Sequence, residues 1–358
     1  MWAVSFMVSS FRRGKRIRKG FIRALAATGW ALVFCLAALR PALAEDVIRL
    51  RYANFPAATT FPCVQMEKWA EVVRERSGGR LEIETYPGGT LLDARSILRG
   101  VARGQADIGC ISLSYHPGSF PFFDLFGLPL GFDSARDAGE VAWAMYRKYQ
   151  PKELAPYKVL LMFTCSPSQI MSSVPLSSLD DLRGLPLRAA GSLSDVIATV
   201  DGQAVSMPMS EAPEALQKGV VKGVFSSWDV LKDYNFAESC RYGLTVDSSV
   251  YPFVVVMNKK AWDALPADLQ HLLDDYADEH CRWTGDYVDD WGRQAVAWSE
   301  QTYGFELRNL PDSDRARMAG LTAPLLEQWK AKAADLGLDG QAVLDDIFRM
   351  RDELKAGR

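Results

Sequence analysis

The sequence predicts an α/β protein of two lobes linked by a long helix, and three observations support this fold class. Strand-like and helix-like segments alternate in a first run over residues 47–112 and in a second run over residues 157–227. A long helical pattern then covers residues 267–303. The chain has 358 residues, of which 48% are hydrophobic and 24% charged, so it can form about two domains of ordinary globular composition.

The first run predicts three strands and two helices in alternation. Apolar periodicity marks the elements, and glycines or prolines end most of them. The predicted strands cover residues 47–53, 81–86 and 106–112, and the predicted helices cover residues 60–76 and 93–103. This order implies a parallel, doubly wound sheet. Residues 120–132 are rich in aromatic residues, proline and glycine, and they predict an irregular segment packed on a domain or cleft.

The second run predicts a further set of strands with short helices between them. The predicted strands cover residues 158–164, 169–173, 186–190, 223–227 and 250–257, and the predicted helices cover residues 179–184, 194–200 and 210–218. The carboxyl end is also expected to be helical. The predicted first lobe comprises residues 45–165 plus 251–291, and the predicted second lobe comprises residues 166–250 plus 292–358.

The first 44 residues have the pattern of a secretory signal peptide. Eight basic residues and no acidic ones fall in this segment, and small residues precede a potential cleavage site after Ala44. The apolar stretch at residues 24–39 is shorter than the roughly 20 residues needed to span a bilayer. We therefore expect cleavage after Ala44 and a periplasmic mature chain.

The mature chain is strongly acidic. Removing the eight basic residues of the signal segment leaves 33 lysines and arginines against 44 acidic residues, a net charge of −11. Such a surface repels phosphate backbones, so nucleic acid is not an expected partner.

The cysteines give no indication of a metal site. Five remain after the predicted cleavage: Cys63, Cys110, Cys165, Cys240 and Cys281. They are widely spaced and have no neighbouring histidine, so no metal ligands and no cofactor are predicted. Export permits disulfides, although an odd number leaves at least one free thiol, and burial as small apolar side chains is the alternative.

No catalytic constellation stands out. The chain has no G-x-S-x-G, H-E-x-x-H or phosphate-loop motif. His116 follows Tyr115 at the end of a predicted strand, where it could be a hydrogen-bonding residue of a cleft or, as the less favoured alternative, a general base. We therefore assign no catalytic residues and expect no enzyme activity.

Arg188 is the most informative charged residue. It lies in the apolar stretch Leu-Pro-Leu-Arg-Ala-Ala-Gly at the end of a predicted strand. Ligands of α/β proteins bind in the crevice at the carboxyl ends of parallel strands, and a guanidinium offers two parallel donors that match a carboxylate. An arginine at an exposed strand end is the alternative.

Five segments, spread over nearly all of the mature chain, resemble a known family in the correct order. They are residues 77–80 with 86–89, residues 101–109, residues 179–188, residues 210–223 and residues 255–266. The chain resembles the solute-binding subunits of tripartite ATP-independent periplasmic (TRAP) transporters, of the C4-dicarboxylate-binding type.

This resemblance implies a periplasmic binding protein fold with a ligand cleft between two lobes. It also implies that the residue at Arg188 holds the ligand carboxylate, that the protein delivers an organic acid to TRAP membrane permease subunits, and that no catalysis is involved. We expect a monomer.

Departures from the family pattern bear on the ligand. Gln169 stands where family members often have a second arginine, and Ser226 takes the place of an asparagine. With Trp228, Tyr115 and Phe55 as candidate wall residues, such a pocket favours a monocarboxylate with an apolar or aromatic body. The expected ligand-binding residues are therefore Arg188, Gln169, Ser226, Trp228, Tyr115, Phe55 and His116.

Two other functions stay open at this point. An exported hydrolase would use His116 near Asp107 or Asp124. A ligand sensor would use the same cleft to signal to a receptor instead of a permease.

Overall fold

The computed structural model describes residues 47–357. The predicted signal peptide, with its cleavage site after Ala44, lies outside the described residues. Within residues 47–357, no helix is both long and apolar enough to span a bilayer.

The first sheet contains the three strands predicted near the amino end. Its order is β2-β1-β3-β10-β4, and these strands span Leu81–Tyr86, Ile48–Ala53, Ile108–Ser112, Pro252–Asn258 and Tyr157–Thr164. Strand β1 pairs in parallel with β2 and β3, as predicted. Strand β10 inserts antiparallel between β3 and β4, so the sheet as a whole is mixed. Buried on both faces, β10 reads as a continuous apolar run.

The second sheet has the order β11-β9-β5-β8-β6-β7. Its strands span Glu306–Asn309, Tyr242–Thr245, Gln169–Ser172, Gly223–Ser226, Pro186–Ala189 and Gln203–Ser206. Strand β6 pairs in parallel with β7 and β8, so the carboxyl ends of these three strands meet at one edge. Strands β7, β9 and β11 were not among the predicted elements; each has only four residues.

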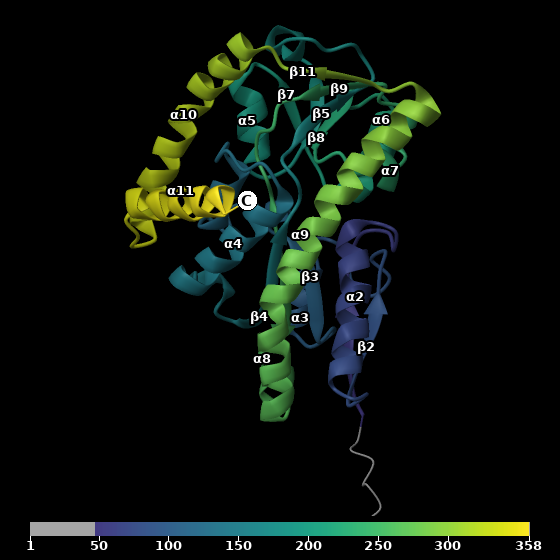
Figure 1. Ribbon diagram of the computed structural model, residues 1–358, viewed down its shortest axis with the longest axis vertical. Coiled ribbons are helices and arrows are strands. Elements are labelled where there is room, and N and C mark those ends of the chain that lie inside the picture. The colour runs from purple at the N-terminus through teal and green to yellow at the C-terminus, as the bar shows by residue number, and fades with distance from the viewer. Residues whose placement is uncertain (1–46, 358) are drawn as a thin grey trace, which may run out of the picture. The chain divides into compact units, whose positions relative to one another are not determined.

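Ten α-helices connect and cover the sheets within the described residues. They are α2 Phe61–Arg76, α3 Ile97–Ala102, α4 Ala135–Tyr149, α5 Leu193–Thr199, α6 Ala212–Gln217, α7 Val230–Asp233, α8 Lys259–Asp263, α9 Ala267–Tyr303, α10 Asp312–Asp335 and α11 Gly340–Ala356. Helix α9 has the predicted bounds. It contacts α2, α4 and β4 of the first sheet and also α7 beside the second sheet, so it links the two (Figure 1).

Helix α4 is absent from the predicted elements, and α3 is shorter than the predicted 93–103 segment. The signal for α4 is nevertheless present, because the Ser134 hydroxyl accepts a hydrogen bond from the Asp137 amide at 3.0 Å and caps the helix. Helix α11 packs against α4, while α10 contacts α5. The proposed lobe boundaries stay a prediction.

The irregular aromatic segment at residues 120–132 packs into the core, as expected. It contains a single 3₁₀ turn, Phe123–Gly127, and its five phenylalanines are buried. Trp329 of α10 donates its indole N–H to the Pro121 carbonyl oxygen at 2.9 Å, which fixes this segment against the carboxyl-terminal helices.

The cysteines of the described chain are buried free thiols. Cys63, Cys110, Cys165, Cys240 and Cys281 are all in this state. Of the two alternatives left open by the sequence, the structure shows the buried apolar role.

Candidate functional site

Arg188 lies on β6 near its carboxyl end and is only 2% exposed. Its Nε and Nη2 donate to the Met207 carbonyl oxygen at 3.0 and 2.8 Å. Among residues 47–357, no carboxylate lies within ion-pair distance of this guanidinium. A buried cation without a counter-charge is costly, so the site is suited to receive an anion.

Tyr115 connects Arg188 to the first sheet. It follows β3 in the 3₁₀ turn Leu113–Tyr115, and its hydroxyl accepts hydrogen bonds from Met209 N at 3.1 Å and Arg188 Nη2 at 3.4 Å. Its ring packs edge-on against Phe55, with centroids 5.4 Å apart. The structure thus brings Arg188, Tyr115 and Phe55 together, although they come from different strands.

A small cavity lies beside Tyr115 between elements of the two sheets. Residues after β1, after β3 and at the start of β10 form one side, and residues after β7 and β8 form the other. The lining residues are Phe55, Pro56, Thr60, Phe61, Pro62, Tyr115, Met209, Asp229, Val230, Asp233, Tyr234, Tyr251 and Phe253. Its volume of about 20 Å³ holds roughly one water molecule. An organic acid therefore needs the two sides to move apart before it can enter.

Ser226 reaches this cavity indirectly. Its hydroxyl lies 2.9 Å from the Tyr251 hydroxyl, and Tyr251 lines the cavity. Ser226 is itself fully buried on β8, so it positions a wall residue in this conformation.

Two acidic residues of the cavity were missed by sequence reasoning. Asp229 and Asp233 lie at and within the single turn of α7, just after β8. Burial raises the pKa of both carboxyl groups, and the negative charge of Asp229 raises the pKa of Asp233 further. The available signal was two acids four residues apart directly after a predicted strand.

Gln169 and Trp228 lie at a different and larger groove of about 990 Å³. The Gln169 side-chain oxygen accepts from the Val246 and Asp247 amides at 2.8 and 3.0 Å, and its Nε2 donates to Asp247 Oδ1 at 2.7 Å. This amide therefore braces the chain after β9. The structure does not bring Gln169 or Trp228 to the cavity beside Arg188.

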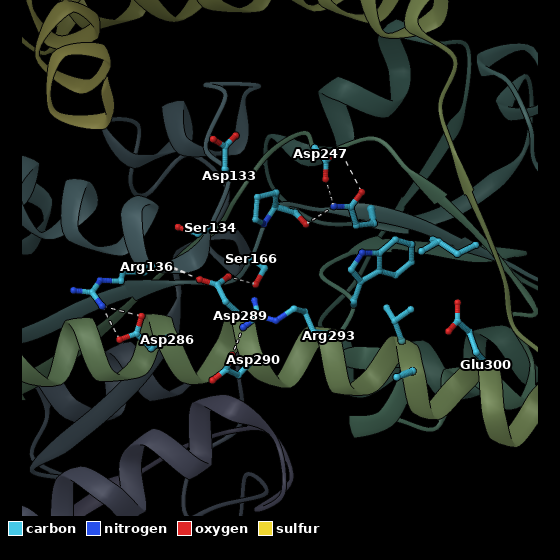
Figure 2. A pocket seen from close by; sticks show the side chains of 17 residues that line it. Asp133, Ser134, Arg136, Ser166, Asp247, Asp286, Asp289, Asp290, Arg293 and Glu300 are labelled. Carbon is cyan, nitrogen blue, oxygen red and sulfur yellow. Dashed lines mark hydrogen bonds and ion pairs between the residues drawn. The ribbon is translucent and has the colours of Figure 1, made fainter. Parts of the chain in front are cut away.

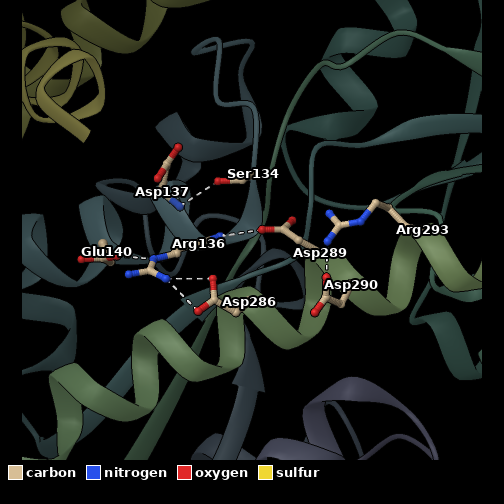
Figure 3. Close-up of polar contacts among 8 residues, drawn as sticks. All are labelled: Ser134, Arg136, Asp137, Glu140, Asp286, Asp289, Asp290 and Arg293. Carbon is tan, nitrogen blue, oxygen red and sulfur yellow. Dashed lines mark hydrogen bonds and ion pairs between the residues drawn. The ribbon is translucent and has the colours of Figure 1, made fainter. Parts of the chain in front are cut away.

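The larger groove runs along α9 and is lined by more acidic than basic side chains, but most of the acidic ones are paired with arginines, backbone amides or hydroxyl groups of the protein. Figure 2 shows the carboxylates and arginines that line it beside this helix. Arg136 Nη1 donates to both carboxylate oxygens of Asp286 at 2.9 and 2.7 Å (Figure 3). Asp289 accepts from the Ala135 amide and from the Ser166 hydroxyl, and Figure 2 shows the contact with Ser166. Asp289 thereby caps the amino end of α4 from α9. These contacts join helices and leave the groove without a reactive arrangement.

His116 lines neither the small cavity nor the larger groove, although it directly follows Tyr115 in the sequence. Burial lowers its pKa, its Nε2 is buried without a hydrogen-bond partner in the described chain, and its ring packs edge-on against Phe120. Asp107 is bound to Arg51, and Asp124 lines a separate small cavity, where burial raises its pKa to about 6. No hydrogen bond joins His116 to either acid within residues 47–357, so the hydrolase constellation is not assembled.

Among the described residues, no group of three or more histidine, cysteine or acidic side chains is arranged to hold a metal ion.

Comparison with known proteins shows the same family from sequence and from structure. The family described as "Bacterial extracellular solute-binding protein, family 7" (DctP) matches residues 53–332. The C4-dicarboxylate-binding periplasmic protein DctP of Rhodobacter capsulatus is 24% identical over 315 residues, which is 86% of this chain and 93% of that protein.

Two solved structures illustrate the structural likeness. A TRAP periplasmic solute binding protein from Desulfovibrio salexigens is 51% identical with a TM-score of 0.78, covering 86% of this chain and 96% of that one. It is an open complex with the C-terminus of a symmetry mate in its ligand binding site. A TRAP solute binding protein from Rhodoferax ferrireducens with copurified benzoate is 22% identical with a TM-score of 0.82, covering 87% and 100% of the two chains.

Proposed function

The chain belongs to family 7 of the bacterial extracellular solute-binding proteins and is a TRAP solute-binding subunit rather than an enzyme, and we propose that it captures a small organic acid through its carboxylate at Arg188. The acid is a monocarboxylate with an apolar or aromatic body. The protein delivers it to the TRAP membrane permease in the periplasm, after cleavage of the signal peptide behind Ala44.

The observation that carries this proposal is the burial of Arg188 without a carboxylate partner in residues 47–357. Its Nε and Nη2 are held by the Met207 carbonyl oxygen, while Nη1 has no protein acceptor in the described chain. A ligand carboxylate would neutralise the charge in a place screened from water, where a charge-assisted hydrogen bond is strong.

The walls of the cavity support an apolar or aromatic body. Phe55, Phe61, Tyr234, Tyr251 and Phe253 all line it, so most of its walls are aromatic rings. The absence of a second arginine at position 169 removes the partner that a second carboxylate would use. The benzoate in the Rhodoferax relative is an acid of the proposed class, and a chain terminus, as bound in the Desulfovibrio relative, also presents a carboxylate.

The contacts between the two sides of the cavity support a role in delivery as well as in capture. Tyr115 of the first sheet contacts Arg188 and Met209 of the second, so an anion bound at Arg188 would lie where the two sides meet. The closed arrangement can then signal to a membrane partner that the ligand is bound.

Isothermal titration with matched mono- and dicarboxylates tests the proposal. Arg188→Ala should weaken binding of the preferred acid about a hundredfold, because the ligand charge would be left unpaired. Arg188→Lys keeps the charge but loses the two-pronged donor, and it should weaken binding about tenfold. Arg315→Lys is the control, since Arg315 binds Asp247 and the Thr245 carbonyl oxygen away from the cavity.

Wild-type affinity in both Arg188 variants would show that the anchor is wrong. Recovery of the acid unchanged after incubation with the protein would agree with binding rather than hydrolysis. Loss of cellular uptake of the acid on deletion of the gene would distinguish transport from sensing.

A further inference from the structure

Two carboxyl groups that line the cavity each have one buried oxygen without a hydrogen-bond partner in residues 47–357. Asp229 is 2% exposed, and its Oδ1 has no hydrogen-bond partner in residues 47–357. Asp233 accepts from the Trp291 indole N–H through Oδ1 at 2.8 Å, whereas its Oδ2 is buried with no such partner. Because the Asp233 amide donates to the Asp229 carbonyl oxygen at 3.0 Å, both side chains leave the same helical turn.

No cation of the described chain neutralises this pair. Neither carboxylate takes part in an ion pair within residues 47–357, and the nearby Lys232 ammonium lies over the Trp291 ring, 4.3 Å from its centroid. Burial of unpartnered carboxyl groups costs folding free energy. Buried polar groups that lower the stability of the folded protein are typical of binding sites, where a bound ligand supplies the missing hydrogen-bond partner.

Arg188 and the acidic pair reach the cavity in different ways. Asp229 and Asp233 line it directly, whereas Arg188 is not among its lining residues and contacts one of them, because the Tyr115 hydroxyl accepts from Arg188 Nη2 at 3.4 Å. The remaining walls of the cavity are largely aromatic.

We propose that the acid bound at Arg188 also carries an ammonium group, and that Asp229 and Asp233 receive it. This inference rests on the proposed function and narrows its ligand class to zwitterions, such as amino acids with an apolar or aromatic body. The ligand carboxylate balances Arg188, and the ligand ammonium donates to the unpartnered oxygens of Asp229 and Asp233. The aromatic rings beside them also attract a cation.

Pairs of acids that differ only in the ammonium group provide the test. Suitable probes are phenylalanine with 3-phenylpropanoate, and 3-(aminomethyl)benzoate with 3-methylbenzoate, measured by titration calorimetry at neutral pH. The ammonium member should bind at least about tenfold more tightly, as expected for hydrogen bonds between charged groups. Asp229→Asn and Asp233→Asn should remove this advantage and strengthen binding of the deaminated member.

Asp124→Asn is the matched control, because Asp124 is another largely buried acid but lines a different cavity. It should leave the preference unchanged. Thermal unfolding without ligand checks the fold, and the Asp229 and Asp233 variants should be at least as stable as the wild type, since each replaces a buried carboxyl group, whose ionisation burial disfavours, by a neutral amide of similar shape.

The outcomes separate this inference from the function on which it rests. Equal or tighter binding of the deaminated members, still dependent on Arg188, would overturn the ammonium site and leave acid capture intact. Binding of neither member, or binding that is insensitive to Arg188, would overturn acid capture and the ammonium site with it.

Discussion

Arg188 Nη2 lies 3.4 Å from the Tyr115 hydroxyl, and this contact joins the second sheet to the end of a strand in the first. The same hydroxyl accepts from the Met209 amide at 3.1 Å. One phenol thus touches both the proposed anion anchor and the backbone beside it. It can sense whether the two sides of the cavity are together, because both of its donors belong to the opposite side.

Replacing Tyr115 with phenylalanine should weaken ligand binding about fivefold, as expected for the loss of about one net hydrogen bond. The ring and its contact with Phe55 are kept, so the fold should be unaffected. Titration calorimetry and thermal unfolding together measure the two effects. Tyr146→Phe, on α4, is the control and should change neither, and equal affinities of Tyr115→Phe and the wild type would show that the hydroxyl does not stabilise closure.

His280 should make stability fall at acid pH. Its ring is fully buried between Tyr276 and Gln65, and burial lowers its pKa to about 3. Between its ordinary pKa of about 6.5 and pH 3, the unfolded chain binds a proton that the folded chain does not, so the free energy of unfolding decreases as pH falls. At pH 5 this cost is about 2 kcal/mol.

Urea unfolding of the wild type and His280→Gln from pH 7 to pH 4 measures this effect, because the carboxyl groups contribute alike to both proteins. The stability difference between them should shrink toward acid pH. His271→Gln changes an exposed histidine on the same helix and serves as the control. A difference that stays constant with pH would contradict the neutral buried form of His280.

Much of the fold could be predicted because local patterns decide it. Strand β1, helix α2 and the bounds of α9 follow from apolar periodicity and glycine or proline signals. The antiparallel insertion of β10 between β3 and β4 could not be predicted, since β10 pairs with β3 across more than a hundred residues of sequence. Strand β11 has only exposed residues, so it shows no apolar pattern.

The site was predictable only in part for the same reason. The apolar sequence around Arg188 indicates its burial, and Tyr115 and Phe55 follow strands that end at the cavity. The spacing of Asp229 and Asp233 after a predicted strand marks them as candidates, but their place in the cavity depends on which surfaces meet when the two sheets come together, and the local sequence does not contain that information. Gln169 lies in a strand, as predicted, yet its side chain braces the 246–247 backbone instead of lining the cavity.

Gly285 permits the close crossing of α9 over α4. A Cβ added there would lie 2.4 Å from Arg136 Cα and 2.8 Å from its backbone nitrogen, which cannot move without shifting the helix. Gly285→Ala should therefore lower the free energy of unfolding by about 1–3 kcal/mol in urea titrations.

Gly320→Ala is the matched control, because its added Cβ meets no atom within 4 Å on the exposed side of α10. It should raise stability by about 0.5–1 kcal/mol, as alanine is the better helix former. Similar effects of the two substitutions would contradict a tight crossing at Gly285.

The buried free thiols of the described chain make it well suited to fluorescence work. Maleimide reagents need an accessible thiolate, and Cys63, Cys110, Cys165, Cys240 and Cys281 offer none while the protein is folded. A single cysteine introduced on β2 and another on β7 would be labelled over a silent background. Energy transfer between the two dyes would then follow opening and closing in real time, without removal of any of these five cysteines.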